Sequence, residues 1–167
     1  PVVWALKLGA PTSIEATSCG NTKEVHPLSA IVTFRFPARG DLPPVKLTWY
    51  EGTRPPRPDD LEQDRKMPDE GGALIKGSKG TIMFGVYGDS PRIIPESKMK
   101  ELKLPEKTIP RVNGSHEMDW VRACKSGQPA GADFAYSGPL TETCLLGNVA
   151  KRIDGRIEWD AANLRVT

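Results

Sequence analysis

Two aromatic residues and one arginine are the side chains of this sequence best suited to hold a small polar ligand. Trp49 and Tyr50 end a predicted strand, and Arg54 follows at the start of a proline-rich segment. Aromatic rings can stack on a sugar ring, and a guanidinium group can hydrogen-bond to hydroxyls or a carboxylate. An alternative for Trp49 is a place in the core, on the strand face of Val45 and Leu47. Both interpretations stay open for Tyr50, which alternation places on the opposite face.

Glu142, with Thr141 beside it, is a further candidate for contacting a ligand. Both residues fall in the first turn of a predicted helix, near a junction between elements. An acidic side chain near a helix N-terminus is also favoured by the helix dipole, which explains Glu142 without any ligand. We therefore carry Glu142 forward as a candidate substrate-binding residue beside Tyr50, Arg54 and Trp49.

The remaining polar motifs do not support catalysis or metal binding. His26 and His116 are the only histidines, and neither lies in an HExxH or HxH pattern. The acids Asp59, Asp60, Glu62 and Asp64 lie between Arg57 and Arg65 and lack the apolar pocket that would raise one carboxyl pKa. Residues 77–80 (GSKG) lack the spacing of a phosphate-binding loop and instead indicate a hairpin turn. We predict no catalytic residue, no cofactor-binding residue and no metal site in this chain.

Length and composition indicate one domain over residues 1–167. Hydrophobic residues make up 38% of the 167 residues and charged residues 26%, as in globular proteins. The formal net charge is +2 without a basic run, so we expect no nucleic-acid partner. No apolar stretch reaches the roughly 18–20 residues of a membrane helix, so we expect no membrane partner either. The three cysteines lack the spacing of a zinc site or a disulfide framework.

Hydrophobic alternation predicts a sheet, with helices toward the end of the chain. Strands are expected at residues 13–18, 30–36, 45–50, 73–75, 81–87, 92–94 and 156–160, and helices at 1–8, 96–102, 115–126 and from 137 onward. Residues 52–72 carry many prolines and charges and few apolar groups, which predicts a long loop outside the core. Strands in runs, with helices grouped apart, predict an α+β fold with a largely antiparallel sheet.

The helix expected after Ser137 is the most apolar element. Ser137, Gly138 and Pro139 are suited to open it, and Gly155 is suited to end it. Gly147 in its interior predicts that another backbone passes close by. The residues expected to be covered are Leu140, Cys144, Leu145, Val149 and Ile153, with Leu146 and Ala150 beside them. The helix expected from Ser115 has a predicted buried side of Met118, Val121 and Cys124.

Three stretches of the chain together resemble one enzyme family. They are LTETCLLGNVAKR with the following IEWDAANLRVT, SHEMDWVRACKSGQP before them, and PVVWALKLGAPTSIEA at the start. They are similar to the C-terminal region of the Gfo/Idh/MocA oxidoreductases, named for glucose–fructose oxidoreductase and inositol dehydrogenase, and most similar to a bacterial branch. The resemblance covers most of the chain and is least distinctive at about residues 54–71.

The resemblance implies a fold, a role and partners. The family's C-terminal domain, of the dihydrodipicolinate-reductase-like type, is an open antiparallel sheet with helices on one face, and the other face commonly makes subunit contacts. The cofactor, NAD or NADP, binds in the family to an N-terminal Rossmann domain, and no GxGxxG unit is present here. The opening helix has no cap, so we expect an excised substrate-binding and oligomerisation domain that is inactive alone. Its expected partners are the Rossmann domain, further copies of itself and a sugar, cyclitol or related hydroxy compound.

Two alternatives stay open. One is a stand-alone carbohydrate- or protein-binding module that never had a cofactor domain. The other is a domain of an NAD-dependent glycosidase, because a relative of this branch uses its bound cofactor transiently to cleave glycosides. The residues do not decide the substrate, NAD against NADP, the oligomeric state, or whether the protein is cytoplasmic or exported to the periplasm.

Overall fold

A computed structural model describes residues 1–112 and 114–167, and they form two compact units. The first unit comprises residues 1–8 and 50–105, and the second comprises residues 9–49 and 106–167. Among the described residues each unit contains an antiparallel sheet and two helices, so the predicted α+β class and antiparallel pairing are confirmed. One domain over residues 1–167 stays a prediction.

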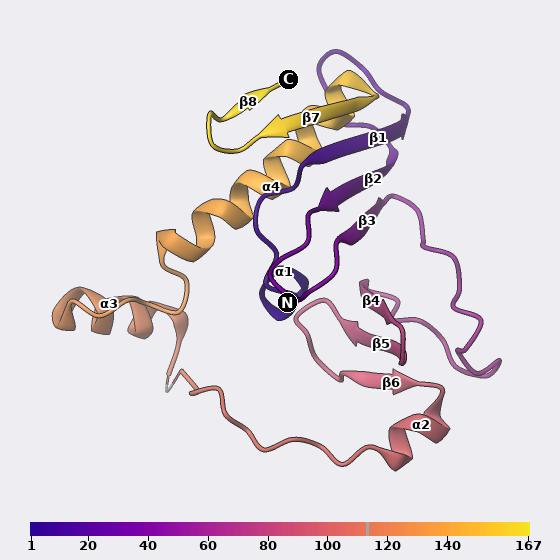
Figure 1. The fold of residues 1–167 in the computed structure, drawn as a ribbon, viewed down its shortest axis with the longest axis vertical. Helices are drawn as coiled ribbons and strands as arrows, with labels where there is room; N and C mark the ends of the chain where they lie inside the picture. Colours follow the sequence, from indigo (N-terminus) through magenta and orange to yellow (C-terminus); the bar gives the residue numbers. More distant parts are fainter. Residues whose placement is uncertain (113) are drawn as a thin grey trace. The chain divides into compact units, whose positions relative to one another are not determined.

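The second unit is built on a five-stranded sheet in the order β3-β2-β1-β7-β8 (Figure 1). Its strands are β1 (Ser13–Cys19), β2 (Ser29–Phe36), β3 (Val45–Glu51), β7 (Arg156–Asp160) and β8 (Arg165–Val166). β1 pairs antiparallel with β2 on one side and with β7 on the other, and β7 pairs antiparallel with β8. The strand after the long helix therefore returns to the middle of the sheet, beside the first strand.

The inner face of this sheet follows the predicted alternation. Ile14 and Ala16 of β1 are buried, and so are Val32, Phe34 and Phe36 of β2. The rings of Phe34 and Phe36 stack with their centroids 6.5 Å apart. Residues two apart on a strand share a face, so these side chains form one apolar surface.

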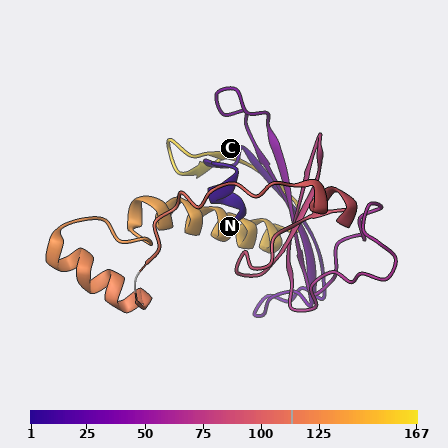
Figure 2. The ribbon, with the colours of Figure 1, turned by 90° about the horizontal axis from the view of Figure 1, so that it is seen from below.

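Helix α4 (Phe134–Ile153) packs on that surface, but it begins earlier than predicted (Figures 1 and 2). The side chain of Asp133 accepts a hydrogen bond from the Tyr136 N–H at 3.0 Å and caps the helix there. Pro139 consequently lies inside the helix, and Glu142 lies beyond its first turn. The predicted stop at Gly155 is also wrong, because Asp154 takes the left-handed position with φ of 52°.

The buried face of α4 agrees with the predicted one at Leu146 and Ala150 and differs from it elsewhere. Its buried residues are Thr143, Leu146, Gly147, Ala150 and Lys151. A Cβ atom at Gly147 would lie 2.9 Å from Cζ of Phe34, so an aromatic ring, and not a backbone, requires the glycine. Leu145 and Ile153, which were expected to be covered, are 55% and 56% exposed. The prediction placed the helix stripe one row away from the face that meets the sheet.

Helix α3 (His116–Ser126) has the predicted ends but not the predicted buried side. Ser115 accepts a hydrogen bond from the Met118 N–H at 3.3 Å, and Gly127 ends the helix with φ of 68°. No residue of α3 is buried, and Met118 and Cys124 are exposed. The expectation that Met118, Val121 and Cys124 pack against the protein is therefore wrong within this chain.

The first unit contains a three-stranded sheet in the order β4-β5-β6, formed by β4 (Gly72–Gly77), β5 (Gly80–Gly85) and β6 (Arg92–Ile94). The short helices α1 (Val2–Ala5) and α2 (Glu96–Glu101) complete it. Gly77 pairs with Gly80, so residues 77–80 are the predicted hairpin turn. Among the described residues, no helix is both long enough and apolar enough to cross a bilayer.

The loop between β3 and β4 contributes to the core of the first unit. Residues 52–71 contain no helix or strand, as the composition indicated. Leu61, however, is only 4% exposed and packs with Met83 and Ile94, with Met67 at the edge of the cluster. The expectation that this loop stays outside the core is wrong, because a single leucine and the buried Pro58 are enough to anchor it.

Candidate functional site

Trp49 and Tyr50 lie at the end of β3, where the structure leaves the tryptophan accessible. Trp49 is 57% exposed, so the core alternative for it is wrong. The reason is that β3 is the edge strand of its sheet and no residue of β3 is buried. Tyr50 is half-buried. An exposed indole on an edge strand can stack on a flat ligand, such as a sugar ring.

Arg54 lies at the start of the long loop and pairs with an acid near the loop's end. Its Nη2 is 3.1 Å from Oδ1 of Asp69, and both side chains are largely exposed. An exposed ion pair is worth little to stability, about 0–1 kcal/mol. The pair joins the two ends of the loop. The Asp69 carboxylate lies against the Arg54 guanidinium, where the carboxylate of a ligand would otherwise bind.

Glu142 has a structural partner that the sequence did not suggest. Its Oε1 accepts a hydrogen bond from the indole Nε1–H of Trp159 at 2.8 Å. Both side chains are half-buried, and the bond joins α4 to β7. The helix-dipole explanation is wrong because Glu142 lies past the first turn. The signal available in the sequence was the alternation of Ile157 and Trp159 on one face of β7.

The predicted site residues therefore have different surroundings. Trp49 and Glu142 belong to the second unit, and Tyr50 and Arg54 belong to the first. The hydrogen bonds and ion pairs described here join Arg54 to Asp69 and Glu142 to Trp159. The two charged residues proposed for ligand contact are thus each engaged by a protein group.

A network of alternating charges fixes the middle of the long loop. Arg65 donates to Glu62 Oε2 at 3.2 Å and to Glu96 Oε2 at 3.0 Å, and Arg92 also lies 3.0 Å from Glu96 Oε2. The backbone N–H of Glu96 donates to Glu62 Oε1. This donor, the N–H of Glu62 itself and the Arg65 guanidinium hold the pKa of the Glu62 carboxyl below its ordinary value. The network binds this part of the loop, called the docked segment here, to Glu96 of α2. The charged residues were instead expected to be solvated.

Loop 20–28 is bound to the end of α4 by a second polar cluster. Arg152 Nη1 donates to the carbonyls of Thr22 and Lys23 at 3.2 and 2.9 Å. Asn21 donates to the carbonyl of the buried Lys151 at 3.4 Å. A hollow of about 30 Å³ is lined here by Asn21, Thr22, His26, Lys151 and Arg152, and it is far below the roughly 300 Å³ of small-molecule pockets. The cluster closes the helix end and does not form a ligand site.

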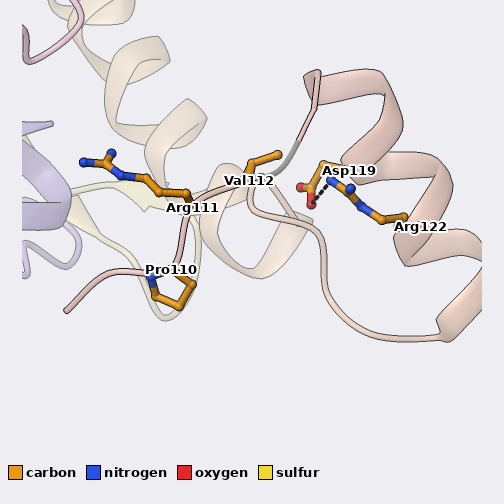
Figure 3. A pocket seen from close by; sticks show the side chains of 5 residues that line it. All are labelled: Pro110, Arg111, Val112, Asp119 and Arg122. Atoms are coloured by element: carbon orange, nitrogen blue, oxygen red, sulfur yellow. Dashed lines mark ion pairs between the residues drawn. The ribbon is translucent and has the colours of Figure 1, made fainter. Parts of the chain in front are cut away.

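A larger hollow of about 410 Å³ lies beside the start of α3 (Figure 3). It is lined by Pro110, Arg111, Val112, Asp119 and Arg122, all exposed except the half-buried Asp119. Asp119 Oδ1 lies 3.9 Å from Arg122 Nη2, while Arg111 points away from that pair (Figure 3). The hollow offers charge without an enclosed apolar wall, unlike the mostly apolar pockets that bind small molecules.

The histidines and cysteines do not gather within the described part of the chain. There, no three His, Cys, Asp or Glu side chains lie close enough to hold a metal ion. Cys19, Cys124 and Cys144 are exposed free thiols. Trp49 is the exposed aromatic residue among the candidate site residues, and Arg54 is the exposed cation among them.

Comparison with known proteins does not add to this description. The chain matches no protein-family model and no curated protein.

Proposed function

We propose that this chain is the substrate-binding and assembly part of an NAD(P)-dependent oxidoreductase that acts on a sugar, a cyclitol or a related hydroxy compound. The observation that carries the proposal is the five-stranded antiparallel sheet with α4 on one face and its other face exposed. This is the arrangement expected of the C-terminal domain of the Gfo/Idh/MocA family, which the sequence resembles.

In this proposal Trp49, Tyr50 and Arg54 are the residues that contact the substrate. The exposed Trp49 indole supplies a flat surface for a sugar ring, and Tyr50 follows it on the strand. Arg54 supplies a cation whose present partner, Asp69, is exposed and replaceable. The nicotinamide cofactor and the catalytic groups belong to a Rossmann domain, and this chain binds no cofactor by itself.

The exposed sheet face is the assembly surface in this proposal. On it Glu15 of β1 lies between Thr33 of β2 and Arg156 of β7. In the next row the exposed Arg35 and Glu158 lie on opposite sides of Ser13, which is itself buried. The face therefore carries both charge signs at short spacing, and a two-fold axis can bring unlike charges together. A homo-oligomer is the expected assembly.

The test is turnover by the complete open reading frame that encodes this chain, with the 167-residue chain beside it. Both are assayed against sugars and cyclitols with NAD and NADP. Oxidation by the complete protein alone supports the proposal and identifies the substrate. Release of an aglycone without net cofactor reduction would instead indicate a glycosidase. If neither protein turns over and the 167-residue chain binds sugars saturably, it is a binding module and the proposal fails.

The proposed contacts have a matched pair of variants in the complete protein. Arg54→Ala removes the cation and should raise KM for an acidic or polyhydroxylated substrate at least 10-fold with little change in kcat. Asp69→Asn leaves the arginine without its competing carboxylate and should lower KM or leave it unchanged. Equal increases in KM for the two variants would show that the ion pair supports the loop and that Arg54 does not contact substrate.

A further inference from the structure

The second unit carries two apolar helix surfaces that its own fold leaves uncovered. The first, called the α4 face here, consists of Leu145, Val149 and Ile153, which are 55%, 40% and 56% exposed. The second, called the α3 face, consists of Met118, Trp120, Val121 and Cys124. Trp120 is 64% exposed, Met118 and Cys124 are exposed, and Val121 is half-buried.

Helix α3 needs a surface to pack on. It has 11 residues and none of them is buried. Isolated helices shorter than about 12–15 residues are marginal in water, and most helices in proteins gain their stability from packing an apolar face. Continuous exposed apolar stripes of this kind mark interaction surfaces, whereas single exposed apolar residues do not.

We propose that two copies of this chain pair by each laying its α3 face, antiparallel, on the α4 face of the other. The contact is then made twice around a two-fold axis. This surface is separate from the exposed sheet face, so the inference goes beyond the proposed function.

The order of charges favours a second copy in the antiparallel direction. Glu117 precedes the apolar residues of α3, and Lys125 follows them. On α4, Glu142 precedes the apolar residues and Arg152 lies in the last turn, directly before Ile153. Antiparallel packing sets Glu117 against Arg152 and Lys125 against Glu142. Parallel packing would instead place like charges together.

The lengths of the two faces agree. Met118 to Cys124 spans about 9 Å along α3, and Leu145 to Ile153 spans about 12 Å along α4, at roughly 1.5 Å per residue. With antiparallel helices, Met118 meets Ile153, Val121 meets Val149, and Cys124 meets Leu145. Each residue of the α4 face thus has a counterpart on α3, and Trp120 lies beside the three pairs.

The same chain cannot make this contact with itself. The carboxylate of Asp119 accepts the N–H of Gly131 at 2.8 Å, which ties the first turn of α3 to the residues just before α4. Antiparallel packing requires that turn to lie beside Ile153, at the far end of the 20-residue helix α4. That end is about 30 Å away at roughly 1.5 Å per residue. The occupant of the α4 face therefore comes from another copy.

The first test measures self-association of this chain by sedimentation velocity over a range of concentrations. Leu145→Glu on the α4 face and Val121→Glu on the α3 face should each weaken the dimer at least 10-fold. Tyr87→Glu, at a highly exposed position in the first unit, should leave it unchanged. A monomer at all concentrations, or a dimer that neither face variant affects, would overturn the proposal.

Mixing the two variants tests the reciprocal geometry. Leu145→Glu keeps a sound α3 face and Val121→Glu keeps a sound α4 face, so a mixed pair retains one of its two contacts. The mixture should dimerise more tightly than either variant alone, which also shows that both variants are folded. If Val121→Glu dimerises like the unaltered chain, α4 pairs with α4 and the proposal is wrong.

An engineered disulfide between two copies tests whether the α3 face of one meets the α4 face of the other. In a Cys19→Ser, Cys144→Ser background, Leu145→Cys is added and Cys124 is kept. Diamide then oxidises two thiols to a disulfide and is itself reduced to the hydrazine. A covalent dimer on a non-reducing gel is the expected product, and Arg156→Cys in place of Leu145→Cys should give little of it. A disulfide within one chain would overturn the proposal.

Discussion

The indole N–H of Trp159 donates a hydrogen bond to Oε1 of Glu142 at 2.8 Å, and this bond joins β7 to α4. It links the middle of α4 to the strand that returns beside β1. Both groups are half-buried, so each depends on the other for a polar partner. Glu142 is therefore first a structural residue, and any role in binding must be tested against that function.

Replacing Glu142 by alanine should destabilise the second unit. The indole N–H loses its acceptor while it stays half-buried, which costs about 1–3 kcal/mol. Glu142→Gln keeps an acceptor oxygen and should cost less. Urea unfolding followed by tryptophan fluorescence gives both values, with Trp159→Phe as the reciprocal change. Additive effects of Glu142→Ala and Trp159→Phe in the double variant would show that the two side chains are not coupled.

Gly147→Ala should destabilise the protein although alanine is the better helix former. The added Cβ would lie 2.9 Å from Cζ of Phe34, and overpacking of this kind costs about 1–3 kcal/mol. The matched control is Gly138→Ala in the same helix, where a Cβ meets no atom within 4 Å. That change should stabilise α4 by up to about 1 kcal/mol. Thermal unfolding of both variants measures the difference in stability. Replacing Phe34 by leucine should reduce the destabilisation that Gly147→Ala causes. Equal effects of the two alanines would refute the close contact.

Acid should release the docked segment of the long loop. The pKa of Glu62 is lowered in the fold, so its carboxylate stabilises the fold at pH values above its ordinary pKa of 4.5. That contribution is lost as the pH falls through the lowered folded value. Hydrogen exchange of residues 58–66 should rise in that acid range, whereas Glu62→Gln should show raised exchange already at neutral pH. Identical pH profiles for the two proteins would exclude Glu62 as the group responsible.

Leu61→Ala should loosen the core of the first unit. Leu61 is 4% exposed and packs with Met83 and Ile94, and truncating a buried leucine costs about 2–5 kcal/mol. Leu104→Ala, at an exposed position of the same unit, should change the free energy of unfolding by less than about 0.5 kcal/mol. Chemical denaturation of the two variants is the measurement. A small effect of Leu61→Ala would mean that the loop is not part of the core.

Much of the secondary structure could be predicted because it depends on local pattern. The alternation of Val32, Phe34 and Phe36 fixed both the strand and its buried face. Ser115 and Gly127 fixed the ends of α3 through cap geometry that involves only neighbouring residues. Gly77 to Gly80 fixed the hairpin because a two-residue turn demands such residues.

The buried side of each helix could not be predicted in the same way. Several rows of α4 are apolar, and the sheet covers the row with the small residues Gly147 and Ala150 because Phe34 requires that space. Leu61 was missed because one apolar residue in a charged loop gives no periodic signal. The core alternative for Trp49 arose because alternation shows which residues share a face but not whether a strand lies at the edge of the sheet.

For the candidate site, the sequence determined the residue types and their positions on elements: an aromatic pair closing β3, an arginine opening the loop, and an acid on α4. Only the tertiary structure decided that Arg54 is held by Asp69 and Glu142 by Trp159. It also decided that Arg65 and Glu62 anchor the loop to Glu96. Local patterns arise from neighbours in the chain, whereas partners separated by 15 to 34 residues are set by how the elements pack.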